Sequence, residues 1–393
     1  MECLEYTPVV PRGNRVWLAA TCCAVMFIYA VFFGAFSVLL PNIGQAFGVG
    51  PGVAGRLFPA DFTGFILGVL VCGYLSDILG RKIVLSIGLV VCSVGLAIFG
   101  YSGGMPLALL ASGLIGAGTG AMETVASALA TDLYPECKAR LIMITQVAFG
   151  LGASIGPFVA QGLLMSHVSW RMIYLSIAIG TFVIFLLLAI QPAPQAIGNG
   201  VSIDLSALKK LLSQPYFIGL CLAQALYVGA EVGYFSWLPT YFGHTIQNSA
   251  IWAGLSVTVF WIAITVGRIT TGALLERIGL LRLTFLLSIF SSIGILITVL
   301  APGPLITMVG VMWTGLCCSG IYGLVLSMAG ERYSDITGTA FAGIMACGGV
   351  GGAIIPWIAG VIGASVLGWH AALGLMALIM VLLAALMLNI RRM

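Results

Sequence analysis

The sequence predicts an all-α integral membrane protein with twelve transmembrane helices in two six-helix, pseudo-symmetric halves. Three features predict this class: the composition, the length of the apolar runs, and residues that recur at a fixed offset. Of the 393 residues, 61% are hydrophobic and 7% are charged, whereas about 25% of a soluble globular chain is charged. This composition excludes a soluble enzyme. The 16 Lys and Arg and 12 Asp and Glu are too few and too scattered for a nucleic-acid surface.

Apolar runs long enough to cross a bilayer follow one another along most of the chain. A spanning helix needs about 20 mainly apolar residues. The expected helices cover residues 17–40, 53–75, 83–101, 105–131, 141–165, 170–190, 215–241, 248–269, 281–301, 304–329, 339–363 and 369–389. Because residues 17–40 are too long for a signal-peptide core, we expect the first helix to be retained.

The basic residues between these runs predict the orientation. With a cytoplasmic N-terminus, every Lys and Arg falls on the cytoplasmic side except Arg56 and Arg171. Positive charge is enriched in cytoplasmic loops, so we expect both termini in the cytoplasm. The loops are short and contain no Asn-x-Ser/Thr sequon, which favours the inner membrane of a bacterium.

A duplication is indicated by residues that recur at an offset of 199, as in 272 − 73 = 199. The matched pairs are Gly73 and Gly272, Asp77 and Glu276, Gly80 and Gly279, Tyr134 and Tyr333, Pro157 and Pro356, and Trp170 and Trp369. Parallel repeats of six helices are a known transporter architecture. We therefore expect an N-terminal half at 1–190, a polar cytoplasmic linker at 191–213 and a C-terminal half at 214–393.

A charged turn joins the second and third expected helices and reads Gly73-Tyr-Leu-Ser-Asp77-Ile-Leu-Gly80-Arg81-Lys82. Glycine permits a tight turn, and a carboxylate can accept hydrogen bonds from a helix N-terminus or from Arg81. The segment resembles the signature loop of the major facilitator superfamily. The resemblance implies a central cavity and alternating access by rocking of the halves. The expected cytoplasmic gate, which includes a weaker second copy of the loop, is Gly73, Asp77, Gly80, Arg81, Glu276 and Arg277.

Three acids lie inside expected helices, where an ionised carboxylate is costly. Asp61 is expected near the outer surface as an ion pair with Arg56, or otherwise as a substrate contact. Glu123 and Glu231 lie in mid-span, one in each half. Removal from water favours the protonated carboxyl group, which can then take up a proton on one side of the membrane and release it on the other. We expect both to bind substrate and couple protons; the alternative for either is a permanently neutral group that bonds a neighbour.

The surroundings of these acids are similar to those in the fucose, galactose and glucose proton-symporter group. The resemblance rests on the glycine-rich run before Glu123, on Tyr227-Val-Gly-Ala-Glu231 followed by Trp237-Leu-Pro239, and on residues 150–157. Unlike some members of the group, the first helix has no carboxylate. The resemblance implies proton-coupled sugar transport, with Na⁺ as the alternative coupling ion.

A sugar site combines an aromatic platform with amide and carboxylate groups. The candidate substrate contacts besides the two acids are Gln146, Gln224, Tyr227, Tyr234, Trp261, Trp313 and Tyr322. The spacing i, i+3, i+7 and i+10 is expected to place Gln224, Tyr227, Glu231 and Tyr234 on one helix face. We place Arg268 at a helix end, so no mid-span cation is expected to bind an anion. The three isolated histidines indicate no metal site.

These observations predict a monomeric transporter, not an enzyme, that moves a small molecule across the lipid bilayer without a cofactor. The first hypothesis is proton-coupled symport of a neutral sugar or related polyol by alternating access. The alternative is a proton-coupled antiporter that exports organic cations or drugs. The stoichiometry, the direction of transport and the carboxylate that carries the proton stay open.

Overall fold

The computed structural model describes residues 12–134, 138–192, 210–245, 250–333 and 336–390. The helices of the first half are α1 (Arg12–Ala46), α2 (Pro51–Ala54), α3 (Leu57–Leu79), α4 (Arg81–Tyr101), α5 (Met105–Leu133), α6 (Lys138–Met165) and α7 (Trp170–Ile190). Those of the second half are α9 (Pro215–Thr245), α10 (Ala250–Ile278), α11 (Leu280–Leu300), α12 (Pro304–Cys318), α13 (Ile321–Arg332), α14 (Thr337–Gly363) and α15 (Gly368–Ile390).

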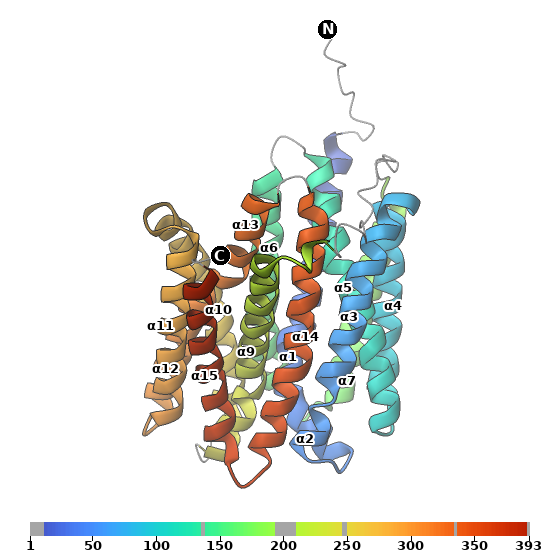
Figure 1. Cartoon of the computed structure of the whole chain (residues 1–393). Coiled ribbons are helices and arrows are strands. Elements are labelled where there is room, and N and C mark those ends of the chain that lie inside the picture. Colours follow the sequence, from blue (N-terminus) through green and yellow to red (C-terminus); the bar gives the residue numbers. More distant parts are fainter. Residues whose placement is uncertain (1–11, 135–137, 193–209, 246–249, 334–335, 391–393) are drawn as a thin grey trace.

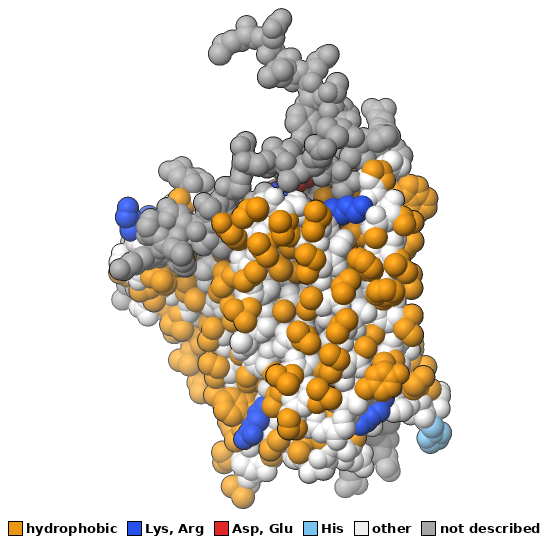
Figure 2. All heavy atoms as spheres, turned by 90° about the vertical axis from the view of Figure 1, so that its right-hand side faces the viewer, with side chains coloured by type: hydrophobic (Ala, Val, Ile, Leu, Met, Phe, Trp, Pro, Cys, Tyr) orange, Lys and Arg blue, Asp and Glu red, His pale blue; other side chains and the backbone are white. Residues whose placement is uncertain are grey.

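Twelve candidate membrane spans confirm the expected fold class. The second candidate span, Pro51–Ser76, includes the short α2. The tenth span, expected to be continuous, is broken at Ser319 and Gly320 between α12 and α13. Figure 2 shows one face of the bundle, on which apolar side chains extend between basic groups near its two ends. This face suits a lipid environment.

Helix pairing is the same in the two halves. The pairs α1–α6, α3–α5 and α4–α7 of the first half correspond to α9–α14, α10–α12 and α11–α15 of the second. Gly80 and Gly279, one of the predicted repeat pairs, both have positive φ, at 94° and 83°, a conformation that glycine adopts without steric cost. The fold is therefore duplicated; the expected limits of the halves stay a prediction, because residues 193–209 lie outside the described residues.

The bundle has two distinguishable ends. We call the end at which α1 begins and α15 ends the termini end, and the opposite end the α2 end (Figure 1). At the α2 end the two halves meet: Trp357 Nε1 donates to Gly52 O at 3.2 Å. α3 also packs on α14. The structure is thus closed at the α2 end.

Close packing of α3 on α5 depends on glycine. A Cβ on Gly116 would lie 1.9 Å from the backbone oxygen of Asp61, and one on Gly64 would lie 2.0 Å from that of Gly113. Backbone cannot yield as a side chain can, so we expect Gly116→Leu to destabilise the first half by about 3 kcal/mol or more. Thermal unfolding of the purified protein tests this.

The matched control is Gly162→Leu, because a Cβ at Gly162 meets nothing within 4 Å. We expect this variant to unfold within a few degrees of the wild type. Equal stability of the two variants would contradict the assigned role of the α3–α5 contact.

Candidate functional site

A cluster of ionisable groups lies where the two halves meet, on the termini side of an aromatic cluster. Glu123 comes from α5 in the first half and Glu231 from α9 in the second, and both side chains are partly buried. The guanidinium of Arg268, on α10, interacts electrostatically with both carboxyl groups. Among the described residues, no direct ion pair of 4.0 Å or less joins Arg268 to either acid. The structure thus brings the two predicted acids into one electrostatic network.

Arg268 also bridges the halves directly. Its Nη1 donates to the backbone oxygen of Gln146, on α6, at 3.1 Å. The Gln146 side chain in turn faces the Glu123 carboxyl group. Gln146 therefore links the cation on α10 to the acid on α5, and its predicted place near the site agrees with the structure.

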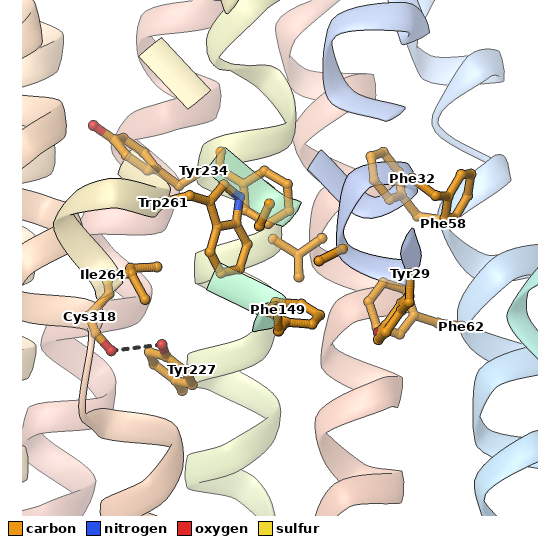
Figure 3. Packing of buried hydrophobic residues seen from close by; sticks show 14 of the residues in the cluster. Tyr29, Phe32, Phe58, Phe62, Phe149, Tyr227, Tyr234, Trp261, Ile264 and Cys318 are labelled. Carbon is orange, nitrogen blue, oxygen red and sulfur yellow. Dashed lines mark hydrogen bonds between the residues drawn. The ribbon is translucent and has the colours of Figure 1, made fainter. Parts of the chain in front are cut away.

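Glu231 is hydrogen-bonded to Tyr227 of its own helix, and this tyrosine also reaches the break in the tenth span. Tyr227 Oη lies 2.7 Å from Glu231 Oε1 and 2.8 Å from the backbone oxygen of Cys318. Figure 3 shows the second of these bonds. Because Cys318 is the last residue of α12, its backbone oxygen is one of the acceptors at a helix end that have no donor within the helix. The Tyr227 hydroxyl is thus shared between the acid and the helix break.

Tyr322 completes the cluster from α13. It interacts electrostatically with both Glu123 and Glu231. Tyr29, on α1, interacts with Glu123 and with Tyr322. The cluster therefore contains residues from α1, α5, α6, α9, α10 and α13, and it draws on both halves.

The aromatic cluster consists of Phe33, Phe149, Phe235, Phe260 and Trp261. Its rings come from both halves: the Trp261 ring centroid lies 5.9 Å from that of Phe33 and 5.7 Å from that of Phe149. Trp261 is 3% exposed, and its indole Nε1 has no hydrogen-bond partner. A buried N–H without a partner is uncommon. Trp261, drawn together with Phe149 in Figure 3, thus offers a free donor in the aromatic cluster.

Three other predicted contacts have their partners or neighbours on other helices. The Trp313 side chain is 42% exposed, and its Nε1 donates to Phe290 O on α11. Tyr234 Oη is bonded to Thr298 Oγ1, also on α11, at 2.7 Å. Gln224 is fully buried, and its Cγ would lie 3.0 Å from a Cβ on Gly348, on α14. The expected face of Gln224, Tyr227, Glu231 and Tyr234 borders several helices, so its members contact different partners.

The expected ion pair between Asp61 and Arg56 is also wrong. Five residues along a helix rotate a side chain by about 140°, so the two side chains leave α3 on different faces. Arg56 is exposed, whereas Asp61 Oδ1 is buried without a hydrogen-bond partner. Asp61 borders a small cavity lined by phenylalanines and by Ser236.

The expected gate is held partly by an ion pair that its own motif does not contain. Arg81 Nε lies 2.9 Å from Asp132 Oδ2, which fixes α4 against α5 within the first half. Gly80 lies at the turn between α3 and α4, Gly73 lies inside α3, and Glu276 and Arg277 are exposed on α10. The Asp77 side chain lies outside the described residues. The gating role stays a prediction.

Arg268 is the residue of this candidate site that the sequence reasoning missed. The eighth span was expected to end at residue 269, whereas α10 continues to Ile278. The acid and base pair Glu276 and Arg277, rather than Arg268, stands at the true end of this helix. At 1.5 Å per residue, Arg268 lies about 15 Å inside the helix. Recognition of the repeated turn at Gly279 would have placed it there.

Twelve spans in two equivalent halves, with ionisable groups where the halves meet, define a multi-pass membrane transporter. The chain belongs to the Major Facilitator Superfamily, whose sequence profile matches residues 22–334 and 253–392. This family consists of transporters and not enzymes. The "Protein TsgA homolog" of Edwardsiella ictaluri is 24% identical over 346 residues, 86% of this chain and 85% of the relative. That of Yersinia pestis (strain Pestoides F) is 22% identical over 369 residues, 92% of each.

Solved structures share the fold. The E. coli fucose:proton symporter FucP, in an outward conformation, has a TM-score of 0.68 and 21% identity, covering 96% of this chain and 99% of that one. A D-xylose-proton symporter has a TM-score of 0.76 and 16% identity, covering 95% and 96%. A bacterial homologue of the human lysosomal transporter Spinster, in an inward-facing and occupied conformation, has a TM-score of 0.79 and 12% identity. The match covers 98% of each chain. The bacterial relatives indicate the inner membrane.

Proposed function

We propose that this chain is a proton-coupled symporter of a neutral sugar or related polyol that works by alternating access. The observation that carries the proposal is the cluster of two carboxyl groups and one guanidinium at the meeting of the halves. Such groups are costly in a membrane and mark substrate or proton pathways. Their position lets a proton or a substrate affect both halves.

The adjacent groups suit a polyhydroxylated, uncharged substrate. The free Nε1 of Trp261 can donate to a hydroxyl group, and the aromatic rings can pack on apolar C–H faces. Arg268 does not favour an anion, because two acids compete for its single charge. The fucose and xylose symporters among the solved structures support this substrate class.

We place the termini end in the cytoplasm, because basic residues are concentrated there. The closed α2 end then faces outward, so the site is shut off from the outside in this conformation. Every group of the cluster comes from one chain, so we propose that a monomer transports.

The test is uptake of labelled hexoses and deoxyhexoses into proteoliposomes with an inward proton gradient. We expect accumulation of at least one sugar, lost in Glu123→Gln and Glu231→Gln, because each substitution removes one of the two ionisable carboxyl groups of the cluster. A sodium gradient without a proton gradient is the control, and it should drive no accumulation.

The aromatic cluster also suits an organic cation, through cation–π contacts. The same vesicles therefore separate the alternative antiporter from the symporter. Exchange of cationic dyes for protons, with no sugar uptake, would replace the symporter by a proton-coupled exporter.

A further inference from the structure

The hydrogen bonds at Tyr227 contain information about the protonation of Glu231. A tyrosine hydroxyl has one hydrogen to donate and can also accept. The Cys318 backbone oxygen, 2.8 Å away, can only accept, so that bond uses the Tyr227 hydrogen. The 2.7 Å contact with Glu231 Oε1 is then a hydrogen bond only if the carboxyl group donates. Both bonds exist together when Glu231 is protonated.

If Glu231 were ionised, fewer of these polar groups would have a hydrogen-bond partner. Tyr227 could then give its hydrogen to the carboxylate, but the Cys318 oxygen would lose its donor. Cys318 is buried, and a buried polar group without a partner costs about 1–3 kcal/mol. The observed geometry therefore favours the neutral acid.

The charge balance indicates that Glu123, in contrast, is ionised. One guanidinium, that of Arg268, interacts with both acids and can compensate only one negative charge. Gln146 connects Arg268 to Glu123, since its backbone accepts from the guanidinium and its side chain faces the carboxyl group. Glu231 has no such link.

Each surrounding helix places different groups around the two acids. Glu123 faces Gln146 on α6, Arg268 on α10, Tyr29 on α1 and Tyr322 on α13. Glu231 faces Tyr227 on α9, Arg268 on α10, Cys318 on α12 and Tyr322 on α13. Arg268 is the single cation in either set.

We propose that the two acids have separate tasks: Glu231 carries the coupled proton in this conformation, while Glu123 remains ionised as the counter-ion of Arg268. The coupling of this proton to transport rests on the proposed symport function, whereas the two protonation states do not. One proton then accompanies each transport cycle.

The loss of this proton has a structural consequence. Glu231 releases H⁺ to water and becomes a carboxylate; the Tyr227 hydrogen turns from the Cys318 oxygen to Glu231, and the O–H bond of Tyr227 stays intact. The carbonyl at the α12–α13 break loses its donor. Ser319 Oγ, in this break, lies 3.1 Å from Thr271 Oγ1 on α10. The protonation state of Glu231 is thus transmitted to the helix that carries Arg268.

Infrared spectroscopy of the reconstituted full-length protein tests the assignment without substrate. At neutral pH, the wild-type spectrum should contain the carbonyl stretching band of a protonated carboxylic acid. We expect the wild-type minus Glu231→Gln difference to contain that band and the wild-type minus Glu123→Gln difference to lack it. The matched pair excludes other protonated acids, such as Asp61, because these cancel.

A band that disappears in Glu123→Gln and persists in Glu231→Gln would overturn the proposal, as would a wild-type spectrum without such a band. If Glu231→Gln does not fold, Tyr227→Phe provides a second assignment: removal of the hydroxyl should shift the band without abolishing it. An unshifted band in Tyr227→Phe would also overturn the proposal.

Transport assays separate this inference from the proposed function. A glutamine at 231 cannot take up and release a proton, so Glu231→Gln should lose the accumulation driven by the gradient. If no sugar moves in the wild type but the band belongs to Glu231, only the symport function is wrong. If sugar accumulates but the band belongs to Glu123, only the division of tasks is wrong.

Discussion

Replacement of Arg268 by glutamine is expected to lower gradient-driven uptake about a hundredfold. The substitution removes the single cation that faces Glu123 and Glu231. Loss of one partner of a buried charge pair costs about 3–5 kcal/mol; we take the lower value because Arg268 is half-buried and forms no direct ion pair. The measurement is the initial rate of uptake at a fixed proton gradient.

The matched control is Arg282→Gln on α11, the next helix. Arg282 is exposed, and its replacement should change the rate by less than about twofold, as is usual for charges in water. Arg268→Lys keeps the charge but not the planar donors that bond the Gln146 oxygen, and an intermediate rate is expected. Wild-type uptake by Arg268→Gln would contradict the role assigned to this residue.

A second-site change distinguishes charge balance from shape. In Arg268→Gln with Glu123→Gln, no ionised group is left without its partner. We expect this double variant to be more stable to heat than Arg268→Gln alone. A double variant that is less stable, by the sum of the two single effects, would show that the two residues act independently.

The number and type of helices could be predicted because hydropathy is a local property of the chain. The turns at Gly80 and Gly279 could also be predicted, since their sequences recur at a constant offset. Hydropathy along the chain does not show how far a helix continues beyond the apolar part of a span. For this reason the expected eighth span ends nine residues before α10 does, and Arg268 is expected at a helix end rather than in the site.

The positions of side chains around a helix were predicted less well. Helical spacing gives the angle between Tyr227 and Tyr234, but not which helix lies at that angle. In the structure Tyr227 meets the break after Cys318, whereas Tyr234 meets Thr298 on α11. The bond between Tyr227 and Glu231, four residues apart, follows from local geometry and confirms that part of the expected stripe.

Gly352→Leu is expected to shift the protein toward a state that is open at the α2 end. A Cβ on Gly352, on α14, would lie 2.5 Å from the ring of Phe62, on α3, so the two halves cannot approach as closely there. Overpacking of this kind costs about 1–3 kcal/mol, roughly a 5- to 150-fold change in the equilibrium between the two states. Since transport requires both states, uptake should fall at least about tenfold.

The opening can be measured as a distance between spin labels in a cysteine-free background. Gln45→Cys on α1 and Val366→Cys, before α15, are exposed positions at the α2 end of the two halves. Gly352→Leu should move the distance distribution between these labels to longer values. Gly374→Leu, whose Cβ meets nothing within 4 Å, is the control and should leave it unchanged.

The adjacent glycine makes the test specific for the contact between halves. A Cβ on Gly351 would lie 1.9 Å from the backbone oxygen of Ala225, within the second half. Gly351→Leu should therefore reduce folding rather than alter the label distance of the folded fraction. If Gly352→Leu also reduces folding and leaves that distance unchanged, the α3–α14 contact stabilises the fold and does not control access, and closure of the α2 end must then depend on α2 and α14 or on α6 and α10.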